Sequence, residues 1–88
     1  MAWPRHGLDS AQLAELLLWT EDEYLQKTEG SALRRIGYEG WLRNVAVALG
    51  NAATTPVIIK ALESRRGFPS ELVREHVAWA LAQHARHH

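Results

Sequence analysis

The stretch GSALRRIGYEGWLRNVAVALGN, Gly30–Asn51, decides the fold of this chain. Its second half predicts a helix from Tyr38 to Leu49. Apolar residues recur there at the spacing that places them on one helical face: Trp41, Leu42, Val45, Ala46 and Leu49. Val47 makes a second side of this helix apolar, which is typical of a helix packed between two neighbours.

The first half of the stretch predicts a short arginine turn held between two glycines. Gly30 is expected to end the preceding helix, because glycine adopts a positive φ at little cost. Ser31 can then start a new turn, and Gly37 breaks it. The turn carries Arg34 and Arg35, and its glycines allow backbone N–H groups to approach an anion closely.

Upstream of this stretch the sequence predicts two helices. Asp9 or Ser10 can cap the first helix, whose apolar face comprises Leu13, Leu16 and Leu17. Thr20 and Glu23 have the spacing of a capping box, so a second, short helix is expected to begin there. Two of its residues are expected to point inward, namely Tyr24 and Leu25.

Downstream, two further helices are expected. Thr55-Pro56 predicts a helix start, with an inner face of Val57, Ile58, Ala61 and Leu62. Cations followed by glycine end it, at Arg65, Arg66 and Gly67. Ser70 caps the last helix, from Glu71 to about Ala85, which has a wide apolar arc: Leu72, Val73, Val77, Trp79, Ala80 and Leu81.

Two of these helices share an internal repeat. NVAVALGN at Asn44–Asn51 aligns without gaps to HVAWALAQ at His76–Gln83, with an offset of 32 residues. No segment alternates with period two, so no sheet is expected. The predicted fold class is therefore all-α: a small α-solenoid of HEAT-like helix pairs with about five helices. We expect a connector at 1–8, the helical domain at 9–85 and a frayed C-terminus at 86–88.

Composition and charge bound the function. The 88 residues include no cysteine, which excludes disulfides, thiolate metal sites and iron–sulfur ligation by this chain. No apolar run is long enough for a membrane span or a secretion signal, so we expect a soluble, cytoplasmic monomer. The net charge is zero, but residues 1–29 carry two basic and six acidic side chains, whereas residues 30–66 carry six and two. A basic middle segment indicates an anionic partner, although a plain solvated face remains an alternative.

The six basic residues of this segment are candidate phosphate ligands: Arg34, Arg35, Arg43, Lys60, Arg65 and Arg66. For Arg34 and Arg35 the alternative is a salt bridge to the acidic second helix, at Glu23 or Glu29. For the last three, the alternative is the general attraction of a helix C-terminus for cations.

Four motifs together resemble the C-terminal region of bacterial epoxyqueuosine reductases. They are PRHGLDS (Pro4–Ser10), TEGSALRRIG (Thr28–Gly37), WLRNVAVALGN (Trp41–Asn51) and VREHVAWAL (Val73–Leu81). The resemblance covers nearly the whole chain, in order and with comparable spacing. It implies the tRNA-facing helical domain of an oxidoreductase that converts epoxyqueuosine in tRNA to queuosine.

The resemblance also implies what a complete protein of this family contains. Its members have a cobalamin-binding domain and two [4Fe–4S] clusters, followed by a HEAT-like domain that helps to hold the tRNA anticodon arm. We expect this chain to bind that arm, to adjoin the catalytic domains and to be no enzyme by itself, with no catalytic residue and no cofactor of its own. The alternative is a protein scaffold without RNA contact, with an apolar patch near Trp3 and Leu8.

The tryptophans and histidines are expected to be structural. Trp41, Trp19 and Trp79 are predicted to pack in the core rather than to stack on bases, and Trp3 belongs to the connector. His76 is predicted to be buried and bonded to a carbonyl of another helix. His84 and His88 have a spacing that suits a metal, but HARHH is better explained as a frayed end.

Overall fold

The computed structural model describes residues 9–86, and these form helices joined by short turns. The elements, in chain order, are α1 (Ser10–Leu18), α2 (Glu21–Lys27), the 3₁₀ helix η1 (Ala32–Ile36), α3 (Gly37–Gly50), α4 (Pro56–Ser64) and α5 (Glu71–Ala85). Within the described residues there is no strand, so the predicted all-α class is confirmed. None of the described helices is long and apolar enough to cross a membrane.

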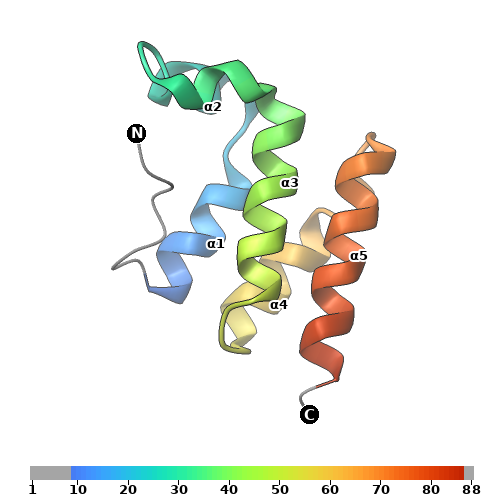
Figure 1. Ribbon diagram of the computed structural model, residues 1–88. Helices are drawn as coiled ribbons and strands as arrows, with labels where there is room; N and C mark the ends of the chain where they lie inside the picture. The colour runs from blue at the N-terminus through green and yellow to red at the C-terminus, as the bar shows by residue number, and fades with distance from the viewer. Residues whose placement is uncertain (1–8, 87–88) are drawn as a thin grey trace.

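Helix α3 is the centre of the arrangement. It packs against α5 along one side and against α1 on the other, as expected for a helix with two apolar sides (Figure 1). Helix α4 packs on both α1 and α5, while η1 and α2 adjoin α3. The two copies of the internal repeat, in α3 and α5, therefore lie side by side and run in the same direction (Figure 1). The HEAT-like pairing of these helices stays a prediction.

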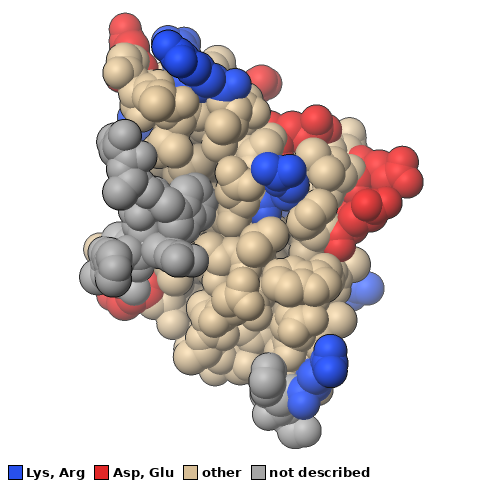
Figure 2. Space-filling view, viewed as in Figure 1, with Lys and Arg blue, Asp and Glu red and all other residues tan. Residues whose placement is uncertain are grey.

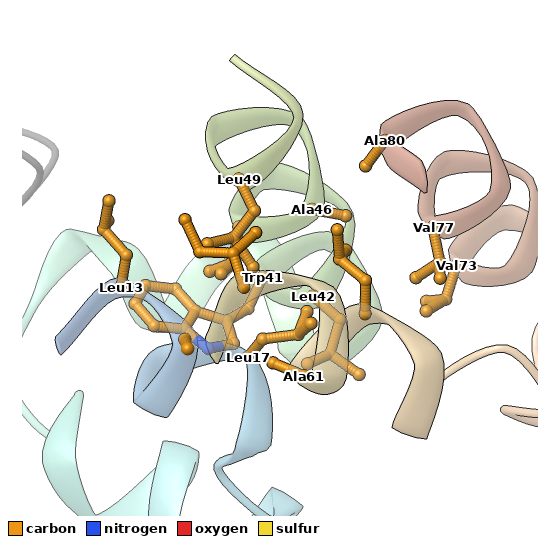
Figure 3. Packing of buried hydrophobic residues seen from close by; sticks show 14 of the residues in the cluster. Leu13, Leu17, Trp41, Leu42, Ala46, Leu49, Ala61, Val73, Val77 and Ala80 are labelled. Atoms are coloured by element: carbon orange, nitrogen blue, oxygen red, sulfur yellow. The ribbon is translucent and has the colours of Figure 1, made fainter. Parts of the chain in front are cut away.

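The core forms where α1, α3, α4 and α5 meet. Trp41 reaches from α3 toward Leu13 and Leu17 of α1, and Val77 of α5 faces α3 (Figure 3). Trp41 is only 1% exposed, and its indole N–H donates to the Leu16 carbonyl at 3.2 Å. Its predicted core position is confirmed, and its removal to alanine is expected to cost about 3 to 5 kcal/mol.

The helix starts follow the predicted capping residues. Asp9 caps α1 and accepts from the Gln12 N–H at 2.8 Å, and Thr20 with Glu23 forms a capping box at α2. Thr55 caps α4 ahead of Pro56, and Ser70 caps α5. The hydroxyl of Ser70 also donates a short hydrogen bond to Glu39, which ties the start of α5 to the start of α3.

Four residues of the predicted apolar faces are exposed. Leu25 of α2 is 36% exposed and Val57 of α4 is 47% exposed, while Leu72 and Trp79 of α5 are 36% and 39% exposed. Each lies at the margin of an apolar arc, so a small rotation of its helix decides whether it enters the core. Helical periodicity identifies the arc, whereas the neighbouring helices select which part of it is covered.

Candidate nucleic-acid interface

The arginine turn is a 3₁₀ helix whose ends have the conformations that the glycines predict. Gly30 precedes it with a φ of 76° and Gly37 ends it with a φ of 79°. Ser31 caps its start, since the Ser31 hydroxyl accepts from the Leu33 N–H at 3.1 Å. At the other end the Gly37 N–H donates to the Arg34 carbonyl. The turn is therefore defined by its own hydrogen bonds.

A buried tyrosine fixes the turn on the core. The Tyr24 hydroxyl donates to the Leu33 carbonyl at 2.6 Å, and Tyr24 itself is fully buried. Its ring lies 5.7 Å from the ring of Trp41, measured between centroids. The backbone that carries the two arginines is thus connected through Tyr24 to the buried Trp41 of α3.

The side chains of Arg34 and Arg35 lie at the surface and share one hollow. Both residues are exposed, and with Gly30, Ser31 and Ala32 they line a depression of about 490 Å³. Within residues 9–86 neither guanidinium has an ion pair, so the alternative of a salt bridge to Glu23 or Glu29 is not found. Two neighbouring cations are therefore available to an external anion.

Arg43 occupies a separate position in the middle of α3. Its Nε and Nη2 both donate to the side-chain oxygen of Asn44, at 3.2 and 2.9 Å, and the residue is half-buried. Figure 2 shows basic atoms over α3 in the middle of this face, and others at its upper end over α2 and η1. Asn44 thus provides a hydrogen-bond partner for the Arg43 guanidinium.

Arg65 is placed differently from the other five candidates. Its Nε donates to the Leu17 carbonyl at 3.1 Å, and its Nη2 donates to the Trp19 carbonyl at 3.2 Å. Its guanidinium also lies 5.6 Å from the centre of the Phe68 ring. These contacts give Arg65 a structural role at the end of α1.

Tyr38 completes this junction. Its hydroxyl donates a short hydrogen bond to the Trp19 carbonyl, the same carbonyl that Arg65 contacts. Burial raises the pKa of the Tyr38 hydroxyl above its ordinary value, and the nearby charge of Arg65 opposes this shift. The hydroxyl therefore stays protonated, and able to donate, across the physiological pH range.

Lys60 and Arg66 lie on other sides of the molecule. Lys60 is exposed and borders a groove between α1 and α4. Arg66 forms an exposed ion pair with Glu63 at 3.0 Å, beside a hollow between α4 and α5. Of the six predicted ligands, only Arg34 and Arg35 line the same hollow. The RNA contacts of all six remain predictions.

The histidine prediction was wrong for His76, and a different histidine has the predicted geometry. His76 is half-exposed, and its Nδ1 donates to the Leu72 carbonyl of its own helix at 2.8 Å. His84 is 1% exposed and bonds the Leu49 carbonyl of α3 through Nε2 and the Thr54 hydroxyl through Nδ1, both at 2.7 Å. His84 is therefore an ordered part of α5 and not part of a frayed end; His88 lies outside the described residues.

The described residues contain no group of three or more His, Cys, Asp or Glu side chains that could hold a metal ion. The whole chain also lacks cysteine, so it has no thiolate for the iron–sulfur clusters that the resemblance implies for complete family members. Those clusters do not fit this chain.

Curated proteins named epoxyqueuosine reductase are similar to this chain over nearly all of its length. The protein from Pseudomonas aeruginosa is 68% identical over 81 residues, which is 92% of this chain and 22% of that protein. The proteins from Xanthomonas campestris and Escherichia coli are 59% and 55% identical, each over 91% of this chain and over 22% and 21% of their own lengths.

The chain is therefore homologous to a part of these proteins, and the resemblance expected from its motifs is confirmed. It spans about a fifth of the length of the curated relatives that it matches. No protein-family model matches the chain. No solved structure matches it either.

Proposed function

We propose, from this homology to the epoxyqueuosine reductases, that the chain is a tRNA-facing binding module of such a cytoplasmic reductase. In this proposal the module holds the tRNA anticodon arm, and other parts of a longer protein carry out the reduction with cobalamin and iron–sulfur clusters. The relatives' name describes a reductase acting on epoxyqueuosine. The proposal assigns RNA positioning, and no catalytic step, to the residues present here.

The observation that carries the proposal is the arrangement of Arg34 and Arg35 in η1. Both guanidinium groups are exposed beside one hollow, on a backbone that Tyr24 attaches to the core. Cations at a fixed spacing can neutralise adjacent phosphates and release their counterions. A preorganised turn also loses little conformational entropy when it binds.

A gel-shift titration with a tRNA anticodon arm tests this proposal. The variant is Arg34→Ala with Arg35→Ala, and its matched control is Arg74→Ala with Arg86→Ala, which removes the same charge from α5 and its C-cap. We expect the first pair to weaken binding at least tenfold, or about 1.4 kcal/mol, and the control pair to change it less than about threefold.

Two results would count against the proposal in different ways. If both double variants bind as well as the unmodified chain, the η1 assignment fails. If the unmodified chain shows no binding even at low salt, the proposed RNA-binding role itself fails.

A second candidate function, that of a protein scaffold, is favoured by the groove between α1 and α4. Leu18 and Val57 are 45% and 47% exposed and border it together with Ala11, Ala14 and Ala61. A scaffold of this kind predicts self-association in sedimentation at rising concentration, which Leu18→Ser with Val57→Ser should abolish. A monomer at all concentrations would oppose it. The patch expected near Trp3 and Leu8 lies outside the described residues.

A further inference from the structure

Trp79 forms one wall of a hollow at the seam between α3 and α5. The hollow has a volume of about 420 Å³ and is lined by Val47, Glu75, His76 and Trp79. Trp79 remains 39% exposed, although its indole is the largest side chain of α5. In the view of Figure 2, the surface over the C-terminal part of α3 is uncharged, with basic atoms over α3 above it and further basic atoms at the C-terminal end of α5.

The indole of Trp79 is held against α3 by a residue without a side chain. A Cβ atom added to Gly50 would lie 2.4 Å from Cζ3 of Trp79 and 3.1 Å from the Ala80 Cα. Gly50 therefore allows one edge of the ring to rest on the α3 backbone while the remainder stays exposed. A ring supported in this way is a rigid stacking surface that needs little reorganisation to bind.

Two of the residues that line the hollow carry hydrogen-bond acceptors, and a positive group lies one helical turn away. Arg43 lies one turn before Val47 on α3, and Asn44 holds its guanidinium. His76 donates through Nδ1 to the Leu72 carbonyl, so in the neutral ring Nε2 is an acceptor. The Glu75 carboxylate is the second acceptor.

We propose that this hollow binds an unpaired RNA base that carries an exocyclic amino group. The base stacks on Trp79, its amino edge faces Glu75 and His76, and Arg43 neutralises the adjoining phosphate. This inference rests on the proposed RNA-binding function and adds a base contact to it. An apolar protein segment here would bury the charges of Arg43 and Glu75 without partners, whereas a nucleotide supplies a partner for each.

Titrations with hexacytidylate and hexauridylate, followed by fluorescence anisotropy of the labelled RNA, test the inference. Trp79→Leu keeps an apolar side chain but removes the ring, and Trp79→Phe keeps a ring. Val57→Ala, in the groove between α1 and α4, is the control for loss of an exposed apolar side chain. We expect Trp79→Leu to weaken hexacytidylate binding about tenfold, and Trp79→Phe and Val57→Ala less than about threefold.

Hexacytidylate is also expected to bind more tightly than hexauridylate, because uracil lacks an amino group. Glu75→Gln should reduce this difference in affinity between the two RNAs. Circular dichroism of each variant verifies that it is folded.

The outcomes separate this inference from the proposed function. If Trp79→Leu binds normally while the Arg34/Arg35 double variant does not, the stacking site is wrong and the RNA-binding role stands. If Trp79→Leu loses binding and the double variant does not, the site stands and the η1 assignment falls. Equal affinity for the two RNAs would overturn the amino-edge contact. No binding to either hexanucleotide at low salt would overturn the base-binding site, whereas the proposed function falls only if the tRNA anticodon arm does not bind either.

Discussion

The Nε of Arg65 donates to the carbonyl of Leu17 at 3.1 Å, across 48 residues of sequence. Leu17 belongs to the last turn of α1, which ends at Leu18, and the backbone leaves the helical conformation at Trp19. The last carbonyls of a helix have no partner within it, and they carry the negative end of its dipole. Arg65 supplies both a donor and a positive charge, so it connects the end of α4 to the end of α1.

Replacement of Arg65 with alanine is therefore expected to lower the free energy of unfolding by about 1.5 to 3 kcal/mol. Its neighbour Arg66 provides the control, because it forms only an exposed ion pair with Glu63, and Arg66→Ala should cost less than about 1 kcal/mol. Urea unfolding followed by circular dichroism measures both. Equal stability of the two variants would contradict the structural role of Arg65.

The two histidines of α5 offer a similar comparison. His84→Leu removes the partner of the half-buried Thr54 hydroxyl and a hydrogen bond to the Leu49 carbonyl, and is expected to cost about 1 to 3 kcal/mol. His76→Leu, at a half-exposed site on the same helix, should change stability by less than about 0.5 kcal/mol. Thermal unfolding of both variants decides whether His84 connects α5 to α3 as described.

Gly50 is expected to tolerate no side chain. Gly50→Ala places its Cβ against Trp79 and the Ala80 backbone, and the resulting strain is expected to cost about 1 to 3 kcal/mol. Gly67→Ala is the matched control, because a Cβ there would meet nothing within 4 Å. It should be neutral or slightly stabilising, since alanine restricts the unfolded chain. A neutral Gly50→Ala would show that α3 and α5 are packed less closely.

Acid should weaken the capping box at α2. The Thr20 N–H donates to the Glu23 carboxylate at 2.9 Å, and this bond holds the pKa of Glu23 below its ordinary value of 4.5. A lowered folded-state pKa contributes stability above the unfolded-state value and loses it as the pH falls through the folded-state value. Glu23→Gln keeps an acceptor without titrating, so the melting temperature of the unmodified chain should fall relative to this variant between about pH 5 and pH 3. A constant difference would contradict the prediction.

Local signals predicted much of this structure. The helix starts at Thr20, Thr55 and Ser70 follow from side chains that cap N–H groups within three residues. The glycine-bounded arginine turn follows in the same way, because Gly30 and Gly37 adopt the positive φ that favours glycine. Such features depend only on neighbouring residues, so a single sequence is sufficient to locate them.

Long-range contacts were less predictable. The position of His84 against Leu49 depends on how far α5 extends along α3, and the position of Arg65 depends on α1 ending beside α4. In the sequence repeat, Trp79 aligns with Val47. The alignment does not reveal that the Trp79 indole lies against the α3 backbone at Gly50 and stays partly exposed. These contacts arise from helix packing, which periodicity alone does not specify.

The salt dependence of binding to the tRNA anticodon arm tests the central claim most directly. Each phosphate neutralised by a cation adds about 0.9 to the slope of log affinity against log salt concentration for a duplex, and about 0.7 for a single strand. If Arg34 and Arg35 contact phosphates, their double alanine variant should have a slope smaller by about 1.4 to 1.8, while Arg74→Ala with Arg86→Ala leaves it unchanged. Equal slopes for the unmodified chain and both double variants would contradict the claim.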